Sequence, residues 1–182
     1  MPLNLPLRTD RLTLRDFEAN DFEAVHRYAS DPEVTHHMFY GPRAESDTRA
    51  YLKRMVASQR KRPRLTWELA VLQPSGRLVG ACDLIVENDG EAALGFVLSQ
   101  DVWGLGYATE VARALIRAGF EQLGLIRIFS TCDVANHASA RVLVKAGLRL
   151  ETTLEEYKYA KGQWWTSFVY SVRRDQWAAN VT

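Results

Sequence analysis

The 182-residue sequence lacks the features that mark several specialised classes of protein. It has no apolar run near the ~20 residues that a membrane-spanning helix needs, and its start lacks the basic-then-apolar pattern of a secretory signal. A charge excess is also missing, because 23 Lys and Arg oppose 22 Asp and Glu and the net charge is +1. Nucleic-acid binders usually carry a strongly basic face. We therefore expect a cytoplasmic protein that binds neither nucleic acid nor membrane.

Cysteine and histidine are scarce as well. The two cysteines, Cys82 and Cys132, lie in apolar stretches without metal-ligand spacing. We expect both to be buried free thiols in a reducing compartment rather than a disulfide. The four histidines form no HExxH-type array, so the sequence predicts no metal site.

What is present is an apolar fraction of 47% and a regular succession of strand and helix patterns. The length fits a single domain over residues 1–182. Turn signals at 74–76 and at Asn88-Asp89-Gly90 join the middle strands into an antiparallel meander. The patterns together predict one mixed α+β domain. Strands are expected over 11–15, 65–73, 78–86, 92–98 and 125–134 and in the tail 148–173, and helices after residues 20 and 46 and over 107–121 and 138–146.

The balanced charge conceals an uneven distribution. Residues 43–64 contain eight basic side chains and two acidic ones, whereas residues 81–101 contain five acids and no Lys or Arg. These segments are either two solvated faces or opposite sides of a cleft that attract different ligands. The acids of the second segment are Asp83, Glu87, Asp89, Glu91 and Asp101.

The segment 93–110 is the most informative, because an apolar strand leads through a glycine turn directly into a helix. Gly104 and Gly106 flank Leu105 in this turn. The first N–H groups of a helix have no internal partner, and glycine lets a phosphate approach the backbone closely. The turn is thus either an anion cradle or a helix entry with unusual dihedral angles. Thr109 replaces the third glycine of the dinucleotide-binding fingerprint, and a Walker A motif is absent.

With its neighbours, this turn resembles a known family. The segment Trp-Gly-Leu-Gly-Tyr-Ala-Thr-Glu at 103–110 is similar to motif A of the GCN5-related N-acetyltransferases (GNAT). More narrowly it resembles the RimJ/RimL-like branch, the bacterial acetyltransferases of ribosomal-protein N-termini. Residues 11–17, 31–34 and 136–148 resemble that branch's first strand, the link after its first helix, and motif B. The resemblance runs from about Arg11 to Trp177. It implies a mixed, mostly antiparallel seven-stranded sheet, splayed between strands 4 and 5 and flanked by helices.

The resemblance also implies acetyl-CoA as cosubstrate, lying in the opening between strands 92–98 and 126–134. The backbone of Phe96, Val97 and Leu98 would pair with the pantetheine arm, and an N–H near Leu98 would hold the thioester oxygen. Arg141 and Lys145, one helical turn apart, either meet the nucleotide phosphates or belong to a solvated face. The pyrophosphate would be held by N–H groups of Trp103, Gly104, Leu105, Gly106, Tyr107 and Ala108.

Three residues are candidates for catalysis. Asn136 is a good N-cap for the helix that follows, and the resemblance adds a hydrogen bond to the pantetheine arm. Ser139 matches the serine near the cofactor sulfur and would protonate the departing thiolate, unless it is only a surface residue. Glu68 is an acid within an apolar strand, so it is either a proton acceptor for the amine or a solvent-facing edge residue.

Two positions depart from the family pattern. Asp101 stands where the family often has Gln or Arg, close to the expected pyrophosphate, and would weaken cofactor binding. Ala93 stands where an acid often supplies the base. His36 and His37 lie in a loop that covers the acceptor cleft and are either substrate contacts or solvated. Other expectations concern the C-terminal strands: Glu155, Glu156, Tyr157 and Tyr159 border the acceptor site, and Trp164-Trp165 form core or dimer contacts.

These features predict an enzyme that transfers acetyl from acetyl-CoA to a primary amine by direct attack in a ternary complex. Presenting a neutral amine at pH 7 costs about 1.4 kcal/mol for an α-amine and about 4.6 kcal/mol for lysine, so a protein or peptide N-terminus is favoured. A small-molecule amine, such as a polyamine or an antibiotic, is the alternative acceptor. A non-catalytic acyl-CoA-binding module and a nucleotide-binding protein are alternatives of other classes. The protein is either a monomer or a homodimer.

Overall fold

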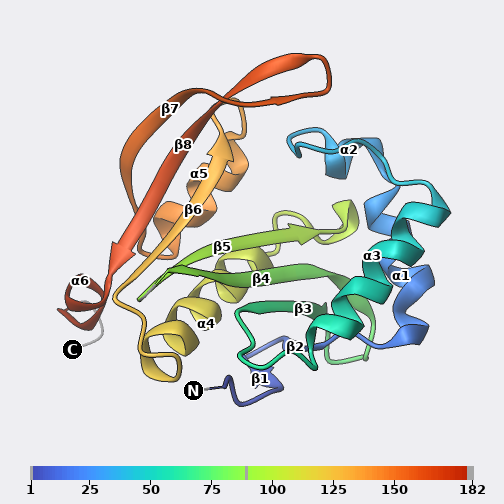
Figure 1. Ribbon diagram of the computed structural model, residues 1–182, viewed down its shortest axis with the longest axis horizontal. Coiled ribbons are helices and arrows are strands. Elements are labelled where there is room, and N and C mark those ends of the chain that lie inside the picture. Colours follow the sequence, from blue (N-terminus) through green and yellow to red (C-terminus); the bar gives the residue numbers. More distant parts are fainter. Residues whose placement is uncertain (1, 89, 180–182) are drawn as a thin grey trace.

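The computed structural model describes residues 2–88 and 90–179. An eight-stranded sheet with the order β1-β2-β3-β4-β5-β6-β8-β7 runs through the molecule (Figure 1). Every neighbouring pair is antiparallel except β5 and β6, which are parallel. The strands are β1 (Leu7–Arg8), β2 (Thr13–Asp16), β3 (Thr66–Leu72), β4 (Leu78–Asn88), β5 (Glu91–Leu98), β6 (Arg127–Asp133), β7 (Arg149–Ala160) and β8 (Gln163–Arg173).

The predicted mixed α+β fold is confirmed, with one strand more than the expected seven. The additional strand is β1, whose two residues Leu7 and Arg8 pair with Leu14 and Thr13. Two residues are too few to show the alternation that identifies a strand in a sequence. The predicted meander of β3, β4 and β5 is also present, although Asp89 in its second turn lies outside the described residues.

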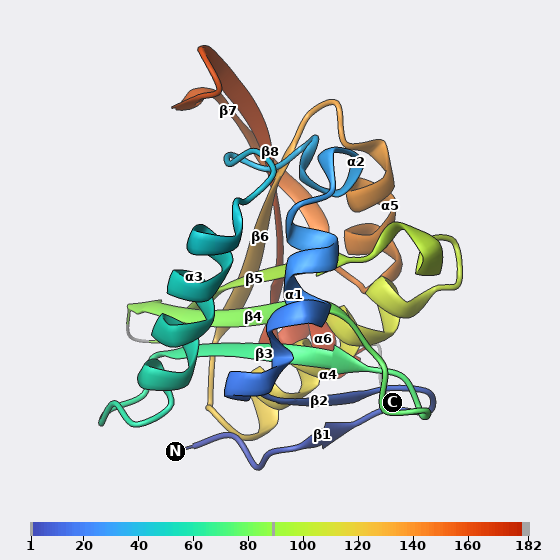
Figure 2. The ribbon, with the colours of Figure 1, turned by 90° about the vertical axis from the view of Figure 1, so that its right-hand side faces the viewer.

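Helices cover both faces of the sheet. Helices α1 (Phe22–Ala29) and α3 (Glu45–Ser58) lie on one face of β2 to β5, and α4 (Tyr107–Glu121) lies behind the sheet (Figure 2). Each face therefore has its own apolar cluster. Within the described residues no helix is long and apolar enough to span a membrane. The shorter helices are α2 (Pro32–Thr35), α5 (His137–Lys145) and α6 (Arg174–Ala179).

The sheet opens between β5 and β6, as predicted. These two strands pair only from Glu91↔Arg127 to Ala93↔Phe129. Beyond Ala93 they diverge, and the rest of β5 has a partner strand on its β4 side only (Figure 1). A strand edge without a partner presents free backbone N–H and C=O groups. The opening therefore offers an extended ligand a row of backbone donors and acceptors.

The loop after α2 meets the turn between β7 and β8. Lys161, in that turn, donates hydrogen bonds from Nζ to the carbonyls of Thr35 (2.8 Å) and His36 (3.1 Å). Phe39 packs edge-on against Trp165 with ring centroids 5.8 Å apart. Trp165 is buried and Trp164 is exposed. These contacts connect the α2 loop to the β7–β8 hairpin across one end of the opening.

Candidate active site

A cleft of about 830 Å³ occupies the opening between β5 and β6. One half lies against the glycine turn and the start of α5, and the other half, which we call the acceptor half, lies between α1, α3 and strands β3 to β5. Of the predicted cofactor-binding residues, only Leu105 does not line the cleft. The predicted cofactor-binding residues that do line it are Phe96, Val97, Leu98, Trp103, Gly104, Gly106, Tyr107, Ala108, Asn136, Ser139, Arg141 and Lys145.

The glycine turn depends on left-handed backbone at both glycines. Gly104 has φ +78° and Gly106 has φ +82°, and Gly106 is the N-cap residue of α4. Leu105, between them, has a half-exposed side chain, and its carbonyl accepts a hydrogen bond from Arg11 Nη1 at 3.0 Å. Arg11 also forms an ion pair with Glu110 at 2.7 Å. The turn is thereby held from the segment between β1 and β2, with the unpaired N–H groups of the first turn of α4 at the cleft wall.

Asp101 does not have the position expected of it. Its carboxylate forms an ion pair with Arg77, and it does not line the cleft. The short helical turn η2 (Gln100–Val102) precedes the glycines and leaves the Asp101 side chain half-exposed to solvent. Trp103 then returns toward β5 and donates from Nε1 to the carbonyl of Leu98 at 2.8 Å. The Asp101 carboxylate is thus paired with Arg77 at the surface, and its effect on cofactor binding stays a prediction.

The start of α5 forms the opposite wall. Asn136 Oδ1 accepts a hydrogen bond from the Ser139 N–H at 2.9 Å, which confirms the predicted N-cap. Both side chains are partly exposed and line the cleft. Within the described residues, neither the Asn136 amide nitrogen nor the Ser139 hydroxyl makes another hydrogen bond. Both groups are free to contact a ligand from this wall.

Two carboxylates and a glycine stand side by side in the acceptor half. Glu68 on β3 is directly opposite Asp83 on β4, and Asp83 is directly opposite Gly95 on β5. Residues opposite one another across a sheet share a face, and all three line the cleft. Glu68 has a strand partner on its β4 side only, because β2 ends opposite Leu69, but its side chain is partly buried and faces the cleft rather than bulk solvent. A Cβ on Gly95 would lie 2.5 Å from Asp83 Oδ2, so glycine there leaves room for the carboxylate.

The two carboxylates differ in their surroundings. The Tyr51 hydroxyl donates a hydrogen bond to Glu68. Burial raises the pKa of Glu68, opposed by the Tyr51 hydrogen bond and by the nearby charges of Arg43 and Arg54. Burial, together with the negative charge of Glu68, raises the pKa of Asp83 to about 7. Asp83 makes no hydrogen bond or ion pair with any described residue. It is therefore a carboxylate at the cleft wall without a hydrogen-bonding partner in the described structure, and its raised pKa suits it to accept a proton near neutral pH.

Most of the acceptor half has no clear signal in the sequence. Asp83 shares with Glu68 the one signal that is present, an acid within an apolar strand, but it also belongs to a run of acids that resembles a solvated face. Tyr28, Tyr51 and Arg43 also line this half, from α1, α3 and the loop between α2 and α3. The Arg43 guanidinium lies 4.1 Å from the centroid of the Tyr51 ring. No local pattern identifies residues that only the packing of α1 and α3 on the sheet brings together.

Other expectations about the acceptor side need correction. His36 and His37 line the cleft, and His37 Nδ1 lies 2.7 Å from Asp133 Oδ2 on β6, so His37 is not simply solvated. The β7 residues expected beside the acceptor do not line the cleft; they lie on the β7–β8 hairpin, beyond the opening (Figure 1). These four are Glu155, Glu156, Tyr157 and Tyr159.

One of the two thiols, Cys132, lies at the cleft wall. Cys82 and Cys132 are buried free thiols, as predicted. Burial raises the pKa of both, Cys132 to about 11, so neither is a thiolate at neutral pH. Among the residues that the structure describes, no group of three or more His, Cys, Asp or Glu could hold a metal ion.

The sheet is splayed, the N-terminus of α4 and its glycine turn form a cradle on one wall of the opening, and carboxylates suited to accept a proton lie on the other wall. This arrangement is typical of an acyl-CoA-dependent N-acyltransferase. The GNAT acetyltransferase domain family matches residues 11–149. The "Uncharacterized N-acetyltransferase YnaD" of Bacillus subtilis is 30% identical over 174 residues, covering 94% of this chain and 98% of that protein. The chain belongs to the GNAT family and is an N-acetyltransferase that uses acetyl-CoA.

Solved structures agree on the fold. A GNAT-family acetyltransferase from Bacillus anthracis superposes with a TM-score of 0.84 at 30% identity, covering 93% of this chain and 98% of that one. RimL, described as a ribosomal L7/L12 alpha-N-protein acetyltransferase in complex with CoA, has a TM-score of 0.82 at 16% identity and coverage of 94% and 98%. A spermidine N-acetyltransferase from Vibrio cholerae, with CoA and spermine, has a TM-score of 0.79 at 18% identity and coverage of 92% and 98%. Their acceptors differ, so this fold serves both proteins and polyamines.

Proposed function

We propose that this enzyme acetylates the N-terminal α-amine of a cytoplasmic polypeptide by direct attack in a ternary complex. The observation that supports this most is Asp83, an open carboxylate in the acceptor half whose pKa is raised to about 7. An α-ammonium group has a pKa of about 8 and a lysine ammonium about 10.4. Transfer of a proton to a base of pKa about 7 is thus unfavourable by roughly one pKa unit for the α-amine and more than three for lysine.

Each step of the reaction has a group on the cleft walls. The N–H groups at the start of α4 bind the pyrophosphate of acetyl-CoA, and the open edge of β5 pairs with its pantetheine arm. Asp83 accepts a proton from the amine, whose nitrogen then attacks the acetyl carbonyl carbon. An N–H near Leu98 stabilises the oxyanion of the tetrahedral intermediate. The carbon–sulfur bond breaks, and the Ser139 hydroxyl protonates the thiolate that leaves. The attacking nitrogen loses its second proton as the amide forms, and Ser139 regains that proton through solvent.

Four further residues position the reacting groups. Asn136 holds the start of α5 through the Ser139 N–H and offers its amide nitrogen to the pantetheine arm. Arg141 and Lys145, exposed on the same wall, face the cleft where the nucleotide phosphates would lie. Glu68, hydrogen-bonded to Tyr51, acts as a positioning residue whose negative charge keeps Asp83 basic.

The experiment that tests the acceptor is a matched peptide panel. One peptide has a free N-terminus and no lysine, a second has a blocked N-terminus and one lysine, and a third has neither amine. Thiol release from acetyl-CoA at pH 7.5 should be fast with the first and at least about a hundredfold slower with the second. Equal rates with both amines would refute the α-amine preference.

Polyamines are the second candidate acceptor, because the adjacent carboxylates Glu68 and Asp83 would also attract a multivalent cation. Spermidine belongs in the same panel, as does an aminoglycoside. Faster turnover of spermidine than of every peptide would replace the first proposal with this one. Tight binding of CoA without turnover of any amine would instead favour a non-catalytic acyl-CoA-binding module. Stronger protection of the protein against heat by ATP than by CoA would favour a nucleotide-binding protein.

A further inference from the structure

The second half of α3 and the turn after it carry positive charge that forms no ion pair within the described part of the chain. Residues 49–62 contain no acidic side chain. Arg49 is satisfied, because it pairs with Glu45 at 3.2 Å and lies over the Phe22 ring. The remaining cations are exposed or partly exposed, and we call them the α3 basic face: Lys53, Arg54, Arg60, Lys61 and Arg62.

This surface is not explained by contacts inside the protein. Within residues 2–88 and 90–179, none of the five makes an ion pair, and Arg62 alone uses its side chain for hydrogen bonds, to backbone carbonyls. The α3 dipole favours cations in the last helical turn, but that turn has no basic residue. Like charges so close together repel one another. A ligand with negative charge would relieve that repulsion.

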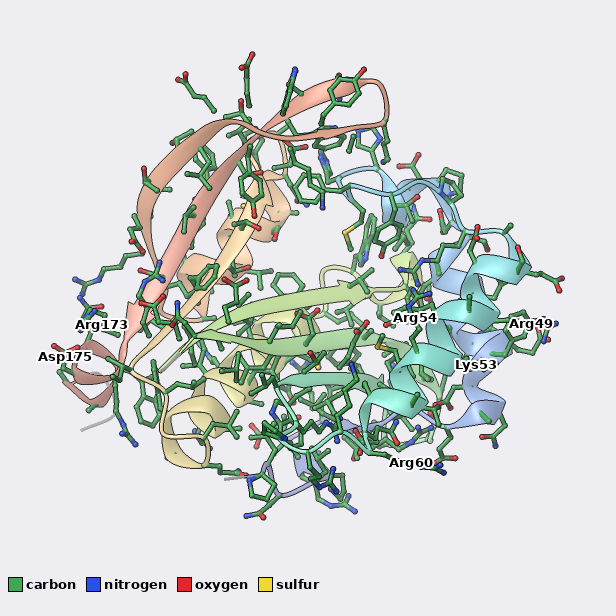
Figure 3. All side chains as sticks on the ribbon, in the orientation of Figure 1. Arg49, Lys53, Arg54, Arg60, Arg173 and Asp175 are labelled. Carbon is green, nitrogen blue, oxygen red and sulfur yellow. The ribbon has the colours of Figure 1, made fainter. Side chains whose placement is uncertain are left out.

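The same helix also forms a wall of the acceptor half. Tyr51 on its inner side donates to Glu68, and the charge of Arg54 is close enough to lower the pKa of Glu68. Figure 3 shows Arg49, Lys53, Arg54 and Arg60 gathered along α3, on the side of the molecule opposite to Arg173 and Asp175. An acceptor chain that leaves the cleft along α3 would therefore meet the basic face next.

We propose that the α3 basic face binds an acidic segment of the acceptor polypeptide, just beyond the N-terminal residues that enter the cleft. This inference rests on the proposed polypeptide acceptor and adds that this polypeptide is acidic close to its N-terminus. A peptide fits better than RNA, because the segment 53–62 that carries the five cations contains no aromatic side chain on which bases would stack. The net charge of +1 also makes general polyanion binding weak.

The dimensions of α3 restrict where the acidic residues must lie. The 14 residues of α3 span about 21 Å. An extended peptide covers about 3.3 Å per residue, so it crosses the whole helix in roughly six residues. The acidic residues should accordingly lie within about ten positions of the acetylated amine.

The test compares three acceptor peptides with the same first three residues, followed by four Glu, four Gln or four Lys. The acidic peptide should have a KM about tenfold below that of the Gln peptide, and added salt should remove this difference. In the double variant Lys53→Gln/Arg60→Gln the preference should shrink to about twofold, with kcat and the KM for acetyl-CoA unchanged. The matched control Arg173→Gln, an exposed arginine on the opposite side of the molecule, should keep the full preference.

A charge-reversed variant, Lys53→Glu/Arg60→Glu, should prefer the Lys peptide, which a merely destabilised protein would not do. Binding of the acidic peptide with a blocked N-terminus, measured by fluorescence anisotropy, separates docking from catalysis: it should occur without thiol release and be lost in the double variant. Equal KM values for all three wild-type reactions would overturn docking while leaving α-amine acetylation intact. Tighter binding of a single-stranded RNA of equal charge, lost in the same variant, would overturn the peptide in favour of a nucleic acid.

Discussion

The Asp83 carboxylate combines a raised pKa with an open position, and this makes activity depend on pH. The deprotonated form accepts the proton, so kcat/KM should rise with pH through about 7 and then level off. Asp83→Asn should lower kcat by about a hundredfold and remove the rise of kcat/KM through pH 7, leaving only the titration of the acceptor amine near pH 8. The measurement is the pH profile of kcat/KM for both proteins with one α-amine peptide. The same rise through pH 7 in the variant would assign the base to another group.

The same carboxylate should lower the stability of the fold, which provides an independent control. Its pKa is about 7 in the folded protein and about 3.9 in an unfolded chain. Between these values the folded state binds more protons, so the free energy of unfolding falls as pH rises. Asp83→Asn should therefore raise Tm above pH 7 and change it little below pH 4. A loss of activity together with this gain in stability would exclude misfolding as the cause.

We propose that Ser139 acts at the other end of the reaction. Its hydroxyl lines the cleft and makes no hydrogen bond within the described structure, whereas its N–H is the donor of the α5 cap. Ser139→Ala keeps that N–H, so α5 should remain intact. We expect a lower kcat, by roughly tenfold or more, with unchanged affinity for acetyl-CoA by isothermal titration calorimetry. An unaltered kcat would show that solvent protonates the thiolate.

Alanine substitution should have opposite consequences at two glycines on adjacent strands, Gly80 on β4 and Gly95 on β5. A Cβ on Gly95 would meet the carboxylate oxygens of Asp83, which are able to rotate away, whereas a Cβ on Gly80 would lie 2.2 Å from the backbone carbonyl of Val97. Gly95→Ala should fold with little change in Tm but lose most of its activity, because Asp83 is displaced. Gly80→Ala should be destabilised by about 2 kcal/mol or more. Thermal unfolding together with thiol release distinguishes the two, and a fully active Gly95→Ala would contradict the placement of the reacting amine beside Asp83.

The elements that the sequence predicted and those it missed differ in how local their signals are. The glycine turn and the Asn136 cap depend on short-range backbone geometry, so their residues indicated them directly. Glu68 stood out as an acid in an apolar strand, but its partner Asp83 became visible only through the register of β3 and β4. Strand register is a long-range property, and a one-residue slip would have moved Asp83 to the other face.

At the scale of the whole molecule, the uneven charge of the sequence has a structural counterpart. Most basic residues of segment 43–64 lie on the outer surface of α3 and the turn after it, whereas Arg43 from this segment and Asp83 from the acidic segment both line the cleft. The two segments are neither independent solvated faces nor simple opposite walls of the cleft. Arg43 and Arg54 come near Glu68 and moderate the negative charge beside Asp83. The arrangement suits an acceptor whose amine is cationic and whose following residues are acidic.

The loop between α2 and α3 joins the two halves of the molecule, since it is anchored to the β7–β8 hairpin across the opening. Lys161 makes two of these contacts, at 2.8 Å to the carbonyl of Thr35 and 3.1 Å to that of His36. Lys161→Ala should loosen the loop beside the acceptor half and raise the KM for the amine by about threefold to tenfold. The KM for acetyl-CoA should not change, because the glycine turn is held separately by Arg11.

Hydrogen exchange provides the direct measurement of that loosening. In Lys161→Ala, amides of residues 35–40 should exchange faster, while those of β4 and α4 keep their protection. Arg149→Ala is a suitable control, because Arg149 is exposed at the far end of β7 and its side chain makes no ion pair or hydrogen bond with a described residue. If Lys161→Ala raised both KM values equally, or left exchange in the loop unchanged, the hairpin would not govern acceptor binding and the β7–β8 turn would serve stability alone.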